Sequence, residues 1–121
     1  MLRGIRGAAT VEKNSREEIW RAAQELVTKI VEKNEISAEN IGAIIFSSTK
    51  DLTAAFPTSA VRKISDFQFV PLFDAQETEV EGSLPLCIRV LILADVEKNL
   101  TEIHHIYLGD AKKLRPDLSG E

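Results

Sequence analysis

The spacing of apolar residues along the chain first predicts one long helix near the N-terminus. Apolar side chains recur at helical intervals over residues 19–31, and Trp20 widens this stripe. Ser15 precedes the stripe and Glu18 lies three positions after Ser15, a spacing typical of a capping box at a helix start. Asn34 is a natural stop for the helix. The pattern therefore predicts about five turns of amphipathic helix that end near Asn34.

Shorter apolar segments predict strands and one further helix. Pro57 suits the first turn of a short helix, which we expect to run to Ser65. Strands are expected at residues 2–11, 41–48, 68–77, 86–94 and 102–108. The order of strand, helix, strand, helix and then three strands predicts an α/β (α+β) fold, in which a mixed sheet carries one long and one short helix on one face.

Composition narrows the class of protein. The 121 residues fit a single domain over residues 1–121, with 44% hydrophobic and 28% charged side chains. A domain of this size leaves much surface exposed, so burial between subunits would stabilise it. The formal net charge is -4 and the basic residues are scattered, which argues against a nucleic acid or a membrane as the partner.

Neither the cysteine count nor the N-terminal segment indicates export. Cys87 is the only cysteine, so no disulfide can form within the chain and no oxidising compartment is implied. No apolar run has the length of a signal peptide core or of a membrane-spanning helix. We therefore expect a cytoplasmic protein.

The sequence lacks several common catalytic patterns. It has no glycine-rich phosphate loop, and its two histidines, His104 and His105, are adjacent. Neighbouring residues on a strand point to opposite faces, so these histidines make a poor metal site, and we expect no metal. A nucleophilic pair with Cys87 would arise only by chance. No cofactor is expected.

Arg89 is the most informative single residue. It lies within the apolar strand pattern of residues 86–94, which is apolar on both faces, as in a strand covered on two sides. An arginine there should be at least partly buried and should need an anionic partner. Two interpretations remain open: a structural ion pair with a glutamate or aspartate, or a guanidinium directed into an anion-binding pocket.

Other polar residues are unremarkable when each is taken alone. Arg6 is flanked by small residues and suits an exposed strand position, and Tyr107 suits a core position with a bonded hydroxyl group. The remaining three would ordinarily be surface charges: Glu77, Arg62 and Arg115.

Taken together, blocks of sequence carry a resemblance to a known family. RGIRGAATVE, TKDLTAAFPTSAVR, VPLFDAQE, LPLCIRVL, HHIYL and LRPDL follow one another between residues 3 and 119. This series resembles the monofunctional, AroH-class chorismate mutases. The resemblance implies a cofactor-free isomerase that converts chorismate to prephenate in phenylalanine and tyrosine biosynthesis. It also implies a homotrimeric pseudo-barrel with active sites in the clefts between subunits.

The resemblance assigns roles to four catalytic residues. Arg6, the second arginine of RGIRG, would bind a substrate carboxylate, and Tyr107 of HHIYL would donate to one. Arg89 of CIRV would contact the ether oxygen of the breaking bond and a carboxylate. Glu77, which closes FDAQE, would accept a hydrogen bond from the ring hydroxyl.

The resemblance also implies further binding residues and shows two departures. Phe56 and Arg62 would come from the adjacent subunit, and Arg115 would help close the entrance. Asp74 stands where other members often have a cysteine, which adds negative charge near the catalytic glutamate while still allowing a hydrogen bond. Ser59 replaces a lysine of some members. We expect both departures to affect substrate affinity more than reaction type.

A different class of function shares this architecture. Small trimeric α/β proteins of the RidA-like group bind carboxylates at subunit clefts, so fold alone would not exclude a non-catalytic binding module. The feature that favours the enzyme is the set of four arginines at family positions: Arg6, Arg62, Arg89 and Arg115.

Overall fold

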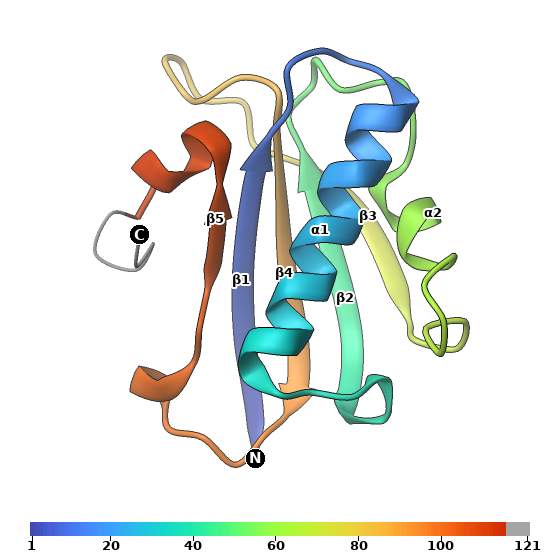
Figure 1. The fold of residues 1–121 in the computed structure, drawn as a ribbon. Coiled ribbons are helices and arrows are strands. Elements are labelled where there is room, and N and C mark those ends of the chain that lie inside the picture. The colour runs from blue at the N-terminus through green and yellow to red at the C-terminus, as the bar shows by residue number, and fades with distance from the viewer. Residues whose placement is uncertain (116–121) are drawn as a thin grey trace.

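A computed structural model of the chain describes residues 1–115 and contains a five-stranded mixed sheet with two α-helices (Figure 1). The strands lie in the order β3-β2-β4-β1-β5. Their bounds are β1 (Leu2–Thr10), β2 (Ile41–Ser48), β3 (Leu72–Gln76), β4 (Cys87–Asp95) and β5 (Ile106–Leu108). The helices are α1 (Arg16–Asn34) and α2 (Pro57–Val61), and three 3₁₀ turns are η1 (Ala38–Asn40), η2 (Leu100–Glu102) and η3 (Gly109–Lys113). The three central strands pair antiparallel, and each edge strand pairs parallel with its neighbour.

Helix α1 begins and ends where the sequence predicts. The Ser15 side chain accepts a hydrogen bond from the Glu18 N–H at 3.2 Å, which is half of the predicted capping box. The Glu18 carboxylate does not return to Ser15 but accepts from the Glu12 N–H at 2.8 Å, so it fixes the β1–α1 connection instead. Glu35 then closes the helix in the left-handed conformation, with φ of 54°.

The main core lies between the sheet and α1, which crosses one face of it (Figure 1). Ile30 and Leu26 of α1, Ile92 of β4 and Phe46 of β2 are all fully buried there. Gly7 of β1 permits this close approach, because a Cβ atom at that position would lie 2.9 Å from Val90 and 3.1 Å from Ile30. Burial of these apolar side chains is the main source of stability in the chain.

Within residues 1–115, the opposite face of the sheet carries no α-helix. On β4, Ile88, Val90 and Ile92 are buried under α1, whereas Arg89 and Leu91 on the other face are only partly buried. The expectation that this strand is covered on two sides is therefore met at Cys87, which is fully buried beside Ala111 of η3, but not at Arg89 or Leu91. The apolar pattern on the second face instead produces a partly exposed apolar surface, which we call the open face.

Three elements are shorter than the sequence predicts. Helix α2 ends at Val61 because the chain turns repeatedly between residues 62 and 66. Strand β3 starts only at Leu72, after Pro71, which removes a backbone donor. Strand β5 has three residues, so the prediction of a strand over residues 102–108 was wrong at its N-terminal side.

The residues before β5 are held by a side chain rather than by a strand partner. The amide of Asn34, which is 1% exposed, accepts from the His104 N–H at 2.8 Å and donates to the His104 carbonyl oxygen at 2.9 Å. His104 and His105 therefore do not occupy alternating strand positions. Within residues 1–115, no helix has both the length and the apolar character needed to cross a bilayer.

Candidate active site

The predicted catalytic residues gather on the open face of the sheet. Arg6, Arg89 and Tyr107 come from β1, β4 and β5 and line one hollow of about 270 Å³. Ala8 of β1 is the cross-strand neighbour of both Arg89 and Tyr107. Its methyl group leaves space between two long side chains, so the register of the sheet creates the hollow.

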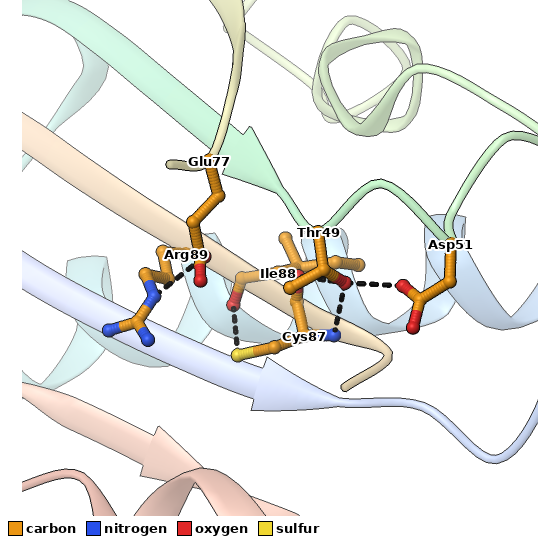
Figure 2. Close-up of polar contacts among 6 residues, drawn as sticks. All are labelled: Thr49, Asp51, Glu77, Cys87, Ile88 and Arg89. Atoms are coloured by element: carbon orange, nitrogen blue, oxygen red, sulfur yellow. Dashed lines mark hydrogen bonds and ion pairs between the residues drawn. The ribbon is translucent and has the colours of Figure 1, made fainter. Parts of the chain in front are cut away.

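Arg89 is paired with Glu77, the glutamate that follows β3. Its Nε donates to Glu77 Oε1 at 2.7 Å, and the two side chains are 37% and 13% exposed, respectively. The Glu77 N–H donates to the Ser48 carbonyl oxygen at 3.0 Å, which ties the glutamate to the end of β2. The expectation of a partly buried arginine with an anionic partner is confirmed. The two terminal nitrogens of the guanidinium extend away from Glu77 (Figure 2).

A polar cluster at the end of β2 fixes the start of β4, two residues before Arg89 (Figure 2). The Thr49 hydroxyl accepts from the Cys87 N–H at 3.0 Å and donates to Asp51 Oδ1 at 2.5 Å. Asp51 Oδ2 accepts from the N–H of Leu86, a residue in the left-handed region with φ of 51°. Sequence reasoning did not identify Thr49 or Asp51; their position directly after a buried strand was the only available signal.

Cys87 is buried in surroundings that disfavour its reactive thiolate form. It is fully buried beside Ala8, Tyr107 and Ala111. Burial raises the pKa of its thiol to about 11, although the nearby Arg89 charge acts in the opposite direction. Since the thiolate is the reactive form, the thiol is poorly suited to attack a substrate at neutral pH.

Tyr107 and His105 lie close to Arg6. Tyr107 is 5% exposed, so it is largely a core residue that reaches the hollow at its edge. His105 Nδ1 accepts from the Arg6 N–H at 2.9 Å. The pKa of His105 is lowered, first by burial and then by the positive charges of Arg6 and Arg115. Sequence reasoning treated this histidine as unremarkable.

A second hollow lies beside α2, near the end of β3, and has a volume of about 610 Å³. Phe56 and Asp74 line it, and Phe56 is 68% exposed. Trp20 Nε1 donates to the Phe56 carbonyl oxygen at 3.2 Å, which fixes the chain at the start of α2. Asp74 Oδ2 accepts from the Thr58 hydroxyl at 2.5 Å. Asp74 Oδ1 is buried, and none of residues 1–115 donates to it.

Asp74 and Glu77 have different partners within one chain. Asp74 bonds to Thr58 of α2, while Glu77 bonds to Arg89 on the open face. Residues three positions apart on an extended chain point to opposite faces, which explains the separation. The structure therefore does not bring Asp74 against Glu77 in a single subunit.

The last two predicted binding residues, Arg62 and Arg115, are not among the residues that line these hollows. Arg62 follows α2 directly and is exposed, and it lines neither hollow. Arg115 follows η3, is partly buried, and is near enough to His105 to affect its pKa. The rest of the LRPDL segment lies outside the described residues. Residues 1–115 of one chain thus present two separate groups of predicted site residues, not one complete pocket.

Comparisons with known proteins assign the family. The family model described as chorismate mutase type I matches residues 2–118. Chorismate mutase AroH of Thermus thermophilus is 49% identical over 119 residues, which cover 98% of this chain and 97% of that protein. Chorismate mutase AroH of Bacillus subtilis (strain 168) is 44% identical over 119 residues, covering 98% and 94%.

A solved structure agrees with both sequence relatives. Chorismate mutase from Clostridium thermocellum superposes with a TM-score of 0.88 at 40% identity, over 92% of this chain and 98% of that one. The likeness therefore extends to nearly all of the sheet and both helices. The chain belongs to the chorismate mutase type I family.

Proposed function

We propose that this chain converts chorismate to prephenate, at an active site formed where two subunits of a homotrimer meet. The observation that carries the proposal is the Arg89–Glu77 pair, held on the open face beside Arg6 and Tyr107, in a chain of this family. Membership of the family does not support the alternative of a non-catalytic carboxylate-binding module. The product would serve phenylalanine and tyrosine biosynthesis, and the cytoplasmic location stays a prediction.

The chemistry of the rearrangement matches these residues. One C–O bond breaks and one C–C bond forms within the same molecule, so the step needs no nucleophile and no proton transfer. The enzyme must hold a dianion in its compact reactive conformer and stabilise negative charge that develops on the ether oxygen. Arginine suits both tasks, because it stays charged and its fork of donors matches carboxylate geometry.

The proposed roles divide into transition-state stabilisation and binding. Arg89 donates from its terminal nitrogens to the ether oxygen, where charge increases as the bond breaks. Glu77 accepts from the ring hydroxyl and, through its bond to Nε, orients the Arg89 guanidinium. Arg6 and Tyr107 bind a carboxylate from the other side of the hollow.

Three observations support a shared site. The hollow of about 270 Å³ on the open face is small for a ligand pocket, which typically exceeds about 300 Å³. Apolar side chains on and beside the open face, such as the partly exposed Leu91 and the 64%-exposed Phe73, are not fully covered by residues 1–115. Arg6, Arg89 and Glu77 together give this half of the site only one net positive charge, whereas chorismate carries two negative charges.

A neighbouring subunit would supply what is missing. Its Phe56 would form a wall of the pocket, its Asp74 would lie beside that wall, and its Arg62 would add positive charge at the polar edge. The buried Oδ1 of Asp74, to which none of residues 1–115 donates, would accept a hydrogen bond from a donor that the assembled site supplies, since a buried acceptor without a partner is costly. Arg115 would lie over the entrance.

The direct test is to mix purified protein with chorismate, without added metal or cofactor, and to identify prephenate as the product. We expect rapid conversion, and Arg89→Ala should lower turnover at least about a hundredfold, the loss typical of one oxyanion donor. Arg21→Ala is the matched control, because Arg21 is 62% exposed on α1 and its removal should leave turnover unchanged. A folded protein that leaves chorismate intact would refute the proposal.

The shared site can be tested by mixing subunits. Arg89→Ala impairs the half-site on the open face, and Phe56→Ala impairs the half-site beside α2. If each active site takes one half from each of two subunits, mixed trimers recover some sites with both halves intact. Activity should therefore rise when the two variants are unfolded and refolded together. Activity that remains at the sum of the separate variants would contradict the shared site.

A further inference from the structure

His105 makes an unusual link between the two strands that carry Arg6 and Tyr107. The parallel ladder between β1 and β5 begins at the pair Gly7 and Ile106. One residue earlier, the backbone N–H of Arg6 has no strand partner on that side and donates instead to His105 Nδ1, at 2.9 Å. The imidazole thus replaces a backbone carbonyl and extends the ladder by one step.

The residue before His105 is held by Asn34 at the end of α1. The buried Asn34 amide holds both the N–H and the carbonyl of His104, at 2.8 and 2.9 Å. Asn34 Nδ2 also donates to the Ile30 carbonyl oxygen at 2.9 Å, so the last turn of α1 anchors the segment that leads into β5. His105 therefore has little freedom to shift relative to the core.

The consequence concerns the spacing of two side chains in the hollow. Arg6 and Tyr107 both line it. Arg6 is itself one partner of the hydrogen bond, and Tyr107 lies two positions after the other partner, His105. We propose that His105 is a positioning residue, which holds β1 against the start of β5 so that Arg6 and Tyr107 bind the same substrate carboxylate. This inference rests on the proposed function, in which these two residues bind that carboxylate.

The protonation state of His105 fits this role. An imidazole nitrogen accepts a hydrogen bond only while it carries no proton, so Nδ1 must be the bare nitrogen. Burial lowers the pKa of His105 below its usual 6.5, and the charges of Arg6, Arg115 and His104 act in the same direction. These are the charged and titratable groups of residues 1–115 that affect it. His105 Nδ1 therefore remains a hydrogen-bond acceptor at neutral pH and loses that capacity when it is protonated in acid.

Three substitutions at His105 separate positioning from mere packing. The oxygen of an asparagine lies near the position of Nδ1, whereas the oxygen of a glutamine lies one bond farther from the backbone. We expect His105→Ala and His105→Gln to raise the KM for chorismate about three- to tenfold, the effect of one neutral hydrogen bond, with kcat within about twofold. His105→Asn should restore the KM. Equal KM values in all four proteins would overturn the proposal.

The dependence of the KM on pH gives a second readout, which does not require the alanine variant to fold well. The KM of the unmodified protein should rise as the pH falls from 7.5 to 5.5, and His105→Asn should remove most of that rise. A histidine with only a packing role would leave the two profiles parallel, and parallel profiles would overturn the proposal.

A third readout needs no catalysis, so it separates failure of this inference from failure of the proposed function. Amide hydrogen exchange at Arg6 should be slow in the unmodified protein and in His105→Asn, and at least about tenfold faster in His105→Gln. Exchange at Gly7, which lies within the ladder, is the internal control. Exchange at Arg6 that is identical in all variants would show that the hydrogen bond does not hold the strand.

Discussion

The two faces of one strand, β4, differ in what they do for the molecule. Val90 and Ile92 point under α1 and are at most 3% exposed, whereas Arg89 and Leu91 point to the open face and remain partly exposed. The covered face contributes stability by burial of apolar surface, and the open face contributes charge and hydrogen-bond donors. Changes on one face should therefore affect folding, and changes on the other should affect chemistry.

The largest effect is expected on the covered face. Among residues 1–115, Phe46 is the largest fully buried side chain. Phe46→Ala should lower the free energy of unfolding by about 3–5 kcal/mol, because it removes apolar contacts and leaves a cavity. Urea denaturation measures this loss. Phe69→Ala is the matched control, since Phe69 is 98% exposed and its loss should change stability by less than about 0.5 kcal/mol. Equal effects of the two substitutions would contradict the claim that burial on the covered face is the main source of stability.

The next effect is expected on the open face. Arg6→Ala should raise the KM for chorismate about ten- to a hundredfold, as expected for a charge-assisted hydrogen bond worth about 1.5–3 kcal/mol. Stability should hardly change, because the Arg6 side chain is exposed. Arg3→Ala is the control on the same strand; Arg3 Nε donates to the Lys98 carbonyl oxygen at 2.9 Å, away from the hollow. An unchanged KM in Arg6→Ala would remove Arg6 from the site.

A pair of glycines tests how tightly the covered face is packed. Gly7→Ala should destabilise the protein by about 1–3 kcal/mol, because the new Cβ would lie only 2.9 Å from Val90. Gly42→Ala places its Cβ at an ordinary 3.6 Å from the Leu93 carbonyl oxygen and should be nearly neutral. Thermal unfolding of both variants gives the comparison. A Gly7→Ala protein as stable as Gly42→Ala would mean that α1 shifts away at little cost.

The smallest effect is a pH dependence of stability that arises beside the open face. Because the pKa of His105 is lower in the folded chain than its usual 6.5, the unfolded chain binds the proton more readily. The contribution of His105 to the free energy of unfolding is therefore complete above pH 6.5, and it declines as the pH falls through the pKa of the folded chain. Urea midpoints at pH 7.5 and 5.5 should differ more in the unmodified protein than in His105→Asn. Equal differences would contradict this origin.

Elements that bury a regular apolar stripe were predictable from the sequence. The periodicity of α1, with Ser15 before it and Asn34 at its end, gave both boundaries. Strand β2 matches residues 41–48, because a short apolar run between polar residues leaves little choice. The end of β5 nearer the N-terminus was not predictable, since a side chain from α1 replaces the expected strand partner there.

The candidate site was predictable in part, for a related reason. Arg89 stood out because a charge in an apolar strand needs a partner, and Glu77 fills that role in the structure. The separation of Asp74 from Glu77 follows from the alternation of side chains along a strand. The family resemblance led us instead to expect the two carboxylates near each other. Thr49 and Asp51 act through backbone groups that are distant in sequence, and such contacts leave no local pattern.

The ion pair between Arg89 and Glu77 has a consequence for the design of inhibitors. Since its two charges largely cancel, a simple anion such as sulfate gains little attraction from it. A ligand that presents an acceptor oxygen beside a hydroxyl donor can bond to both partners at once, whereas a ligand with only one of these groups leaves one partner unsatisfied. The pair therefore favours ligands in which an acceptor group lies next to a donor group. An effective inhibitor should reproduce this arrangement of hydrogen-bonding groups before it reproduces the negative charge of the substrate.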